Sequence, residues 1–115
     1  MSPREWRLRV EDIMAAVRKA AGYVQGMSAE QFAADSRTLD AVVRNLIVIG
    51  EAARRVPEAV CNRHASVPWR LMGDMRNFAV HEYWGVSAET IWRTVSEKLP
   101  PLVPLLEQVL EAEKE

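Results

Sequence analysis

The chain has 115 residues, of which 49% are hydrophobic and 27% charged, a composition typical of one globular domain rather than a disordered segment. Its 15 basic and 16 acidic residues give a net charge of −1, which excludes a protein that coats polyanions by excess charge alone. The single cysteine excludes an internal disulfide and a four-cysteine zinc site. No long apolar run or signal-type N-terminus is present, so we expect a cytoplasmic protein without membrane contact.

The N-terminal segment has the pattern of a long amphipathic helix. Ser2–Glu5 combines a capping box with a proline at the first helical position, and apolar residues then recur every three or four positions. Gly22 and Gly26 predict the end of this helix. Ser28, with Gln31 three residues later, predicts a second and short helix.

A second long helix is expected to begin near Asp35 or Ser36 and to be stopped by Pro57. Its middle, Leu46–Gly50, is apolar on every side, which indicates burial against several neighbours. Residues 57–67 are expected to be a short connecting segment.

The last two predicted helices begin at Pro68 and after Ser87, and the first of them ends near Gly85. Three prolines at positions 100, 101 and 104 predict a kink or break in the final helix, because a proline ring clashes with a preceding carbonyl. From about residue 111 the chain is acidic, and we expect this tail to be frayed.

Residues 1–115 are therefore predicted to form a single all-α domain, an antiparallel bundle of four to five helices with a proline-kinked last helix. Four tryptophans and five methionines are a large apolar load for so small a bundle. Some of this surface is expected to meet a partner, so dimerisation is predicted before any motif is considered.

The search for a proton-transfer group is short, because the sequence has only two histidines. His64 lies in the connecting segment close to Cys61, but two ligands rarely make a metal site. We interpret His64 as a solvated loop residue and Cys61 as a small buried apolar residue. No metal site and no cofactor are predicted.

His81 stands in a richer context. On a helix, Asn77 and His81 are four residues apart and share a face, while Arg76 and Tyr83 are seven apart and share the neighbouring stripe. One short helical stretch thus brings four polar side chains toward one cleft. Without further information, the same set also suits a hydrogen-bonded polar seam in a dimer interface.

The order Arg76-Asn77, His81, Tyr83 resembles the Arg-x4–6-His signature of HEPN domains, and most closely the Arg-Asn-x3-His-x-Tyr motif of HepT toxins. Residues 84–86 and 99–102, and the upstream segment 41–55, resemble the same family. The likeness extends from the first helix to about Leu110. No position of the motif is missing.

This resemblance implies a HEPN-type bundle that forms a homodimer, with the two motifs facing one shared cleft. It implies a metal-independent endoribonuclease toxin of a toxin–antitoxin pair. The partner would be a minimal nucleotidyltransferase antitoxin, which neutralises the toxin by adenylylating the motif tyrosine, here Tyr83.

The residue chemistry agrees with RNA cleavage. His81 can accept or donate a proton at neutral pH, and the guanidinium of Arg76 matches phosphate oxygens in charge and shape. Asn77 would orient His81 or bind substrate. Because one chain supplies one plausible catalytic histidine, a dimer would let acid and base come from different protomers.

Three further residues are candidates for supporting roles. Arg44 and Glu51 would form an ion pair under the site or a link across the dimer, and Trp84 would stack on an RNA base. The alternative function is a catalytically inactive helical dimer that binds a nucleotide or the nucleotidyltransferase. The net charge of −1 favours this alternative slightly, because RNA binding usually relies on excess cations.

Overall fold

The computed structural model describes the backbone of residues 1–85 and 87–114, and the side chains of all of these except 82–85. The described residues form helices and contain no strand, which confirms the predicted all-α fold. In chain order the elements are α1 (Pro3–Val24), α2 (Ala29–Ala34), α3 (Ser36–Arg54), α4 (Glu58–Arg63), α5 (Trp69–Gly85), α6 (Ala88–Arg93), the π-helix η1 (Thr94–Lys98) and α7 (Leu102–Ala112).

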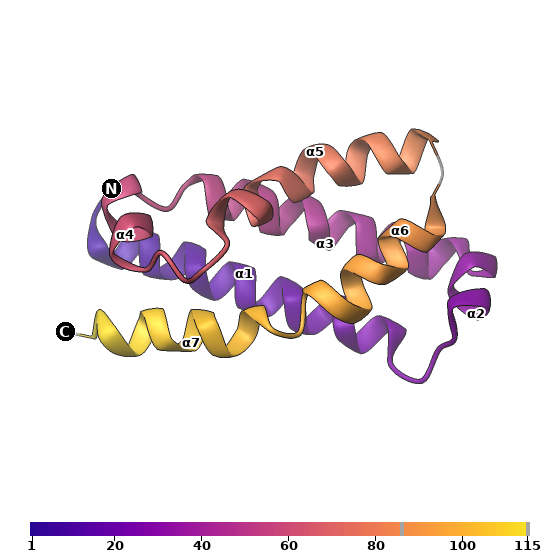
Figure 1. The fold of residues 1–115 in the computed structure, drawn as a ribbon, viewed down its shortest axis with the longest axis horizontal. Helices are drawn as coiled ribbons and strands as arrows, with labels where there is room; N and C mark the ends of the chain where they lie inside the picture. Colours follow the sequence, from indigo (N-terminus) through magenta and orange to yellow (C-terminus); the bar gives the residue numbers. More distant parts are fainter. Residues whose placement is uncertain (86, 115) are drawn as a thin grey trace.

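The long helices lie in a row, with α3 and α1 in the middle, α5 along the outer side of α3 and α7 along the outer side of α1 (Figure 1). Neighbours in the row run antiparallel. The apolar stripes of α1 and α3 face each other, and Ile13, Leu46 and Ile49 are fully buried between the helices. The core therefore lies along the α1–α3 contact, and α5 is held mainly from one side.

The predicted helix starts are confirmed by their hydrogen bonds. Ser2 and Ser28 each form a complete capping box, and the Ser87 side chain accepts a hydrogen bond from the backbone N–H of Thr90. Asp35 caps α3 through the backbone N–H of Thr38, and this hydrogen bond lowers the pKa of the Asp35 carboxyl. Local sequence thus fixes where these helices begin.

The proline-rich segment breaks the last helix as predicted, but the helix first changes from the α to the wider π form. Thr94–Lys98 forms a π-helix, in which the backbone N–H of Leu99 bonds to the carbonyl of Thr94 at 3.1 Å. Because Pro100 and Pro101 have no N–H to donate, the α-helical ladder cannot continue through them. α7 begins afresh at Leu102.

One expectation for the other end of the bundle is wrong. The segment 57–67 is not only a connection, because Glu58–Arg63 forms the short helix α4. α7 ends at Ala112, close to the predicted start of the acidic tail near residue 111, and within this tail the carboxylate of Glu113 contacts Arg63 and His64 of the α4 region. These contacts span about half of the sequence, so no local pattern predicts them.

Within the described part of the chain, no helix has the length and apolar character needed to cross a membrane.

Candidate functional site

The candidate site lies on α5, which forms one edge of the row of long helices (Figure 1). Met72, Met75 and Ala79 are buried and attach α5 to the bundle. Arg76, Asn77 and His81 are all exposed. Their exposure follows from the helical period, because they fall between and opposite the buried positions. The motif side chains are thus presented to solvent by a helix anchored through its apolar face.

Arg76 is held by two neighbours. Its Nε lies 2.6 Å from Oε1 of Glu51 on α3, and its Nη1 donates a hydrogen bond of 3.3 Å to Oδ1 of Asn77. The Arg76 and Glu51 side chains are 44% and 48% exposed, so this ion pair is in contact with water. The guanidinium is therefore oriented by one contact between helices and one within α5, while it remains accessible.

Gly50 brings the two helices together at this point. A Cβ placed on Gly50 would lie 2.7 Å from both the Cβ and the backbone nitrogen of Arg76, which is closer than side chains tolerate. Only glycine permits this approach of α3 to α5. Glu51, the next residue, is thereby placed beside the guanidinium. Gly50 was not predicted to have this role, although a glycine inside a long helix is a usable signal of close packing.

Glu51 has its partner on another helix. Among the described residues Glu51 pairs with Arg76 and forms no ion pair with Arg44, which is exposed on α3; a link of either residue across a dimer stays a prediction. The backbone of Tyr83 and Trp84 continues α5 beyond His81, but their side chains lie outside the described residues. The structure therefore brings together Arg76, Asn77 and Glu51, with His81 exposed on the next turn.

The second histidine has a structural environment rather than a solvated one. Nε2 of His64 lies 3.2 Å from Oε2 of Glu113, and its carbonyl accepts a hydrogen bond from the Trp69 indole. Cys61 is half-buried, and burial raises the pKa of its thiol. Among the described side chains, no group of three possible metal ligands comes together.

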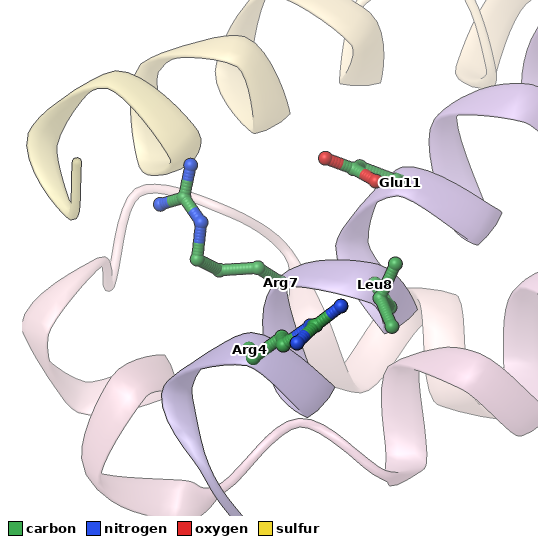
Figure 2. A pocket seen from close by; sticks show the side chains of 4 residues that line it. All are labelled: Arg4, Arg7, Leu8 and Glu11. Carbon is green, nitrogen blue, oxygen red and sulfur yellow. The ribbon is translucent and has the colours of Figure 1, made fainter. Parts of the chain in front are cut away.

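A pocket of about 320 Å³ lies at this same end, lined by Arg4, Arg7, Leu8 and Glu11 of α1. Figure 2 shows Arg7 reaching from α1 toward the end of α7. Its Nη1 donates hydrogen bonds to the carbonyls of Leu110 and Glu113, at 3.1 and 2.8 Å. Arg7 thus satisfies carbonyls that the end of α7 leaves without helical partners, and we interpret it as a structural residue.

Comparison with known proteins agrees with the motif on α5. The family model described as "Ribonuclease HepT-like" matches residues 13–109, and the chain therefore belongs to the HepT-like ribonuclease family, within the HEPN superfamily. The resemblance inferred from the motif is confirmed. Family membership supports a ribonuclease acting on RNA.

Three relatives illustrate the similarity. A Methanocaldococcus jannaschii protein named "Putative RNase MJ0127" is 32% identical over 110 residues, which cover 96% of this chain and 91% of the relative. A Thermococcus cleftensis protein named "Probable ribonuclease HepT" is 37% identical over 93 residues, covering 81% and 84%. "Putative RNase TTE0752" of Caldanaerobacter subterraneus is 37% identical over 91 residues, covering 79% and 81%. No solved structure matches significantly.

Proposed function

We propose that this protein is a metal-independent endoribonuclease toxin of a cytoplasmic toxin–antitoxin pair, with Arg76, His81 and Asn77 as its catalytic residues. One observation carries the proposal: the guanidinium of Arg76 is exposed and oriented by Glu51 and Asn77, one helical turn before the exposed His81. An oriented cation and a proton-transfer group on the same helix are two components that phosphate chemistry without a metal needs.

In the proposed reaction, a ribose 2′-oxygen attacks the adjacent phosphorus while the bond from phosphorus to the 5′-oxygen breaks. One imidazole takes the proton of the 2′-hydroxyl, and a second gives a proton to the departing 5′-oxygen. Arg76 stabilises the negative charge on the pentacoordinate phosphate. Asn77 holds the guanidinium or the substrate, and Glu51 is a positioning residue for Arg76.

The two imidazoles come from two protomers in this proposal, because each chain has one histidine on α5. The outer face of α5 supports such a homodimer. Leu71 and Val80 are 43% and 37% exposed at the two opposite edges of this face, because nine residues turn a helix by about 180°, and Phe78 is half-buried on the Leu71 side. Apolar side chains around polar motif residues are suited to a contact between two copies of the chain.

The proposed partner is a minimal nucleotidyltransferase antitoxin that attaches AMP to Tyr83. Tyr83 follows His81 by two residues on α5. An added phosphate and nucleoside would compete with RNA phosphate for Arg76 and would fill the space beside it. Arg44 and Trp84 are proposed to contact RNA, by charge and by stacking respectively.

The proposal is tested by RNA cleavage in EDTA with mass-verified, unmodified protein. His81→Gln is expected to abolish cleavage. His64→Gln is the matched control, because His64 is the other histidine and lies against Glu113 at the far end of the bundle. Equal cleavage by all three proteins would point to a contaminating nuclease. No cleavage by wild type would favour the alternative, a catalytically inactive dimer that binds a nucleotide or the antitoxin.

A further inference from the structure

A groove runs between α1 and α3 beside the candidate site, with a volume of about 360 Å³. Ile47, Val48 and Ala52 of α3 give it an apolar lining. Ile47 and Val48 are half-buried, although they lie within the apolar stretch 46–50 in the middle of α3. Part of the central apolar surface of α3 is therefore available to a ligand.

The polar rim of the groove joins it to Arg76. Glu51 lines the groove and also forms the ion pair with Arg76. Asp12 and Arg9 of α1 form the opposite wall and are paired at 3.0 Å, and Arg55, the C-cap residue of α3, also lines the groove. An RNA strand whose phosphate is bound by Arg76 would therefore have its neighbouring nucleotide at this groove.

We propose that the groove between α1 and α3 binds a nucleobase of the RNA strand, next to the phosphate held by Arg76. The ligand class rests on the proposed ribonuclease function. Two arginines and two carboxylates leave the groove with no net charge, so it is unsuited to a phosphate. A flat, neutral group with a polar edge matches an apolar floor between charged walls, and single-stranded RNA is recognised in this way.

The carboxylates of Asp12 and Glu51 favour some bases over others. Both are hydrogen-bond acceptors when ionised, so they suit the exocyclic amino groups of cytosine, adenine and guanine. Uracil has no such amino group, and its one base-edge donor, the ring N3–H, lies between two carbonyl oxygens that a carboxylate repels. The groove is therefore selective against uracil at the position next to the scissile phosphate.

Binding of tetranucleotides with 2′-O-methyl riboses tests the groove independently of catalysis, because these oligomers lack the attacking hydroxyl. Fluorescence anisotropy is measured with labelled cytosine, adenine and uracil tetramers. Val48→Trp fills the groove and is expected to raise the Kd for the cytosine tetramer about tenfold, equal to about 1.4 kcal/mol. Leu8→Trp is the matched control: Leu8 is 45% exposed on α1, in the separate pocket of Figure 2.

The selectivity is tested by Asp12→Asn, with Glu11→Gln as a control that removes one charge from the adjacent residue outside the groove. An amide can donate to a uracil oxygen, so Asp12→Asn is expected to narrow the difference in Kd between the cytosine and uracil tetramers. Glu11→Gln is expected to leave that difference unchanged.

The possible outcomes separate this proposal from the nuclease proposal. If wild-type protein binds the tetramers through the groove but does not cleave RNA, the base-site proposal stands and the nuclease proposal is refuted. Cleavage by wild type with unchanged Kd in Val48→Trp would refute the base site alone, as would failure of wild type to bind any tetramer. Loss of the dimer in Val48→Trp but not in Leu8→Trp would show that a second copy of the chain occupies the groove, which also overturns the proposal.

Discussion

Gly50 of α3 packs directly against the backbone of Arg76 on α5. Its missing side chain leaves the space in which the two helices meet, since a Cβ there would approach the Arg76 nitrogen to 2.7 Å. The orientation of the motif arginine therefore depends on a residue with no functional group. Activity and stability are coupled at this contact.

Gly50→Ala is expected to destabilise the fold by roughly 1–3 kcal/mol, because helices α3 and α5 must separate to admit the methyl group. Cleavage should fall further than the loss of folded protein explains, since Arg76 moves with α5. Thermal unfolding and cleavage per folded molecule measure the two effects.

Gly73→Ala is the matched control for this substitution. Gly73 lies on α5 in the same interface, but a Cβ there would meet Cγ of Arg54 at 3.4 Å, an ordinary van der Waals contact. At an interior position of a helix, alanine is more stabilising than glycine by roughly 0.5–1 kcal/mol. We expect unchanged or higher stability and full cleavage. Equal behaviour of the two alanine variants would contradict the role given to Gly50.

Glu51→Gln separates positioning from stability. The pair with Arg76 is nearly half-exposed, and such pairs contribute roughly 0.2–1 kcal/mol, so the melting temperature should change little. We expect kcat to fall about tenfold, because the guanidinium loses its orientation. KM reports separately on the groove, because Glu51→Gln removes both a negative charge beside the RNA and an acceptor for a base amino group. An unchanged kcat would show that Glu51 does not position Arg76.

The proposed dimer face is tested by charge insertion. Leu71→Asp and Val80→Asp place a carboxylate among the exposed apolar residues of α5 and should give monomers in sedimentation or light scattering. Cleavage should be lost with the dimer. Leu8→Asp, at an equally exposed leucine of α1, should leave both properties unchanged. A monomeric variant with full cleavage would exclude a site shared between protomers.

Tyr83→Phe should remain a nuclease and escape the nucleotidyltransferase, because phenylalanine has no hydroxyl to accept AMP. Intact mass after incubation with the antitoxin and ATP measures the modification. Tyr23→Phe is the control at the other tyrosine, which is 45% exposed on α1. AMP found on the Tyr83→Phe protein would assign the modification to another residue.

Local signals in the sequence were sufficient for most of the fold. Four features that depend only on neighbouring residues were predicted correctly: the N-caps at Ser2, Asp35 and Ser87, and the break in the last helix after Leu99. Contacts between distant segments were not predicted. The partner of His64 is 49 residues away, and the partner of Arg76 lies on another helix. The motif on α5 was visible in the sequence, whereas the groove depends on how α1 meets α3.

The contact of Glu113 with Arg63 and His64 predicts a pH-dependent contribution to stability. The hydrogen bond from Arg63, followed by that from His64, lowers the pKa of the Glu113 carboxyl from its ordinary value of 4.5. A carboxyl whose pKa is lower in the folded state stabilises the fold above its unfolded-state pKa, and this contribution disappears as the pH falls through the folded value. Glu113→Gln should therefore melt earlier than wild type at neutral pH.

The difference in melting temperature should shrink as the pH falls below 4.5 and through the lower folded-state pKa of Glu113, where this carboxyl becomes protonated and, like the glutamine, neutral. Glu111→Gln is the control, since Glu111 is exposed on the last turn of α7 and lies 3.9 Å from Lys114. A difference between wild type and Glu113→Gln that stayed constant across the acidic range would show that the carboxylate charge does not stabilise α7.

The position of α5 at the edge of the row has a consequence for motion. α5 is attached chiefly to α3, through Met72, Met75 and Ala79, whereas α1 and α3 are covered on several sides. A segment held along one side can open without unfolding the rest of the domain. Backbone amides of α5 should exchange with deuterium sooner than those of α1 and α3, and should slow when a second copy or RNA covers the helix. The local stability of α5, the helix that carries the motif, then depends in part on whether a second copy of the chain or RNA is bound to it.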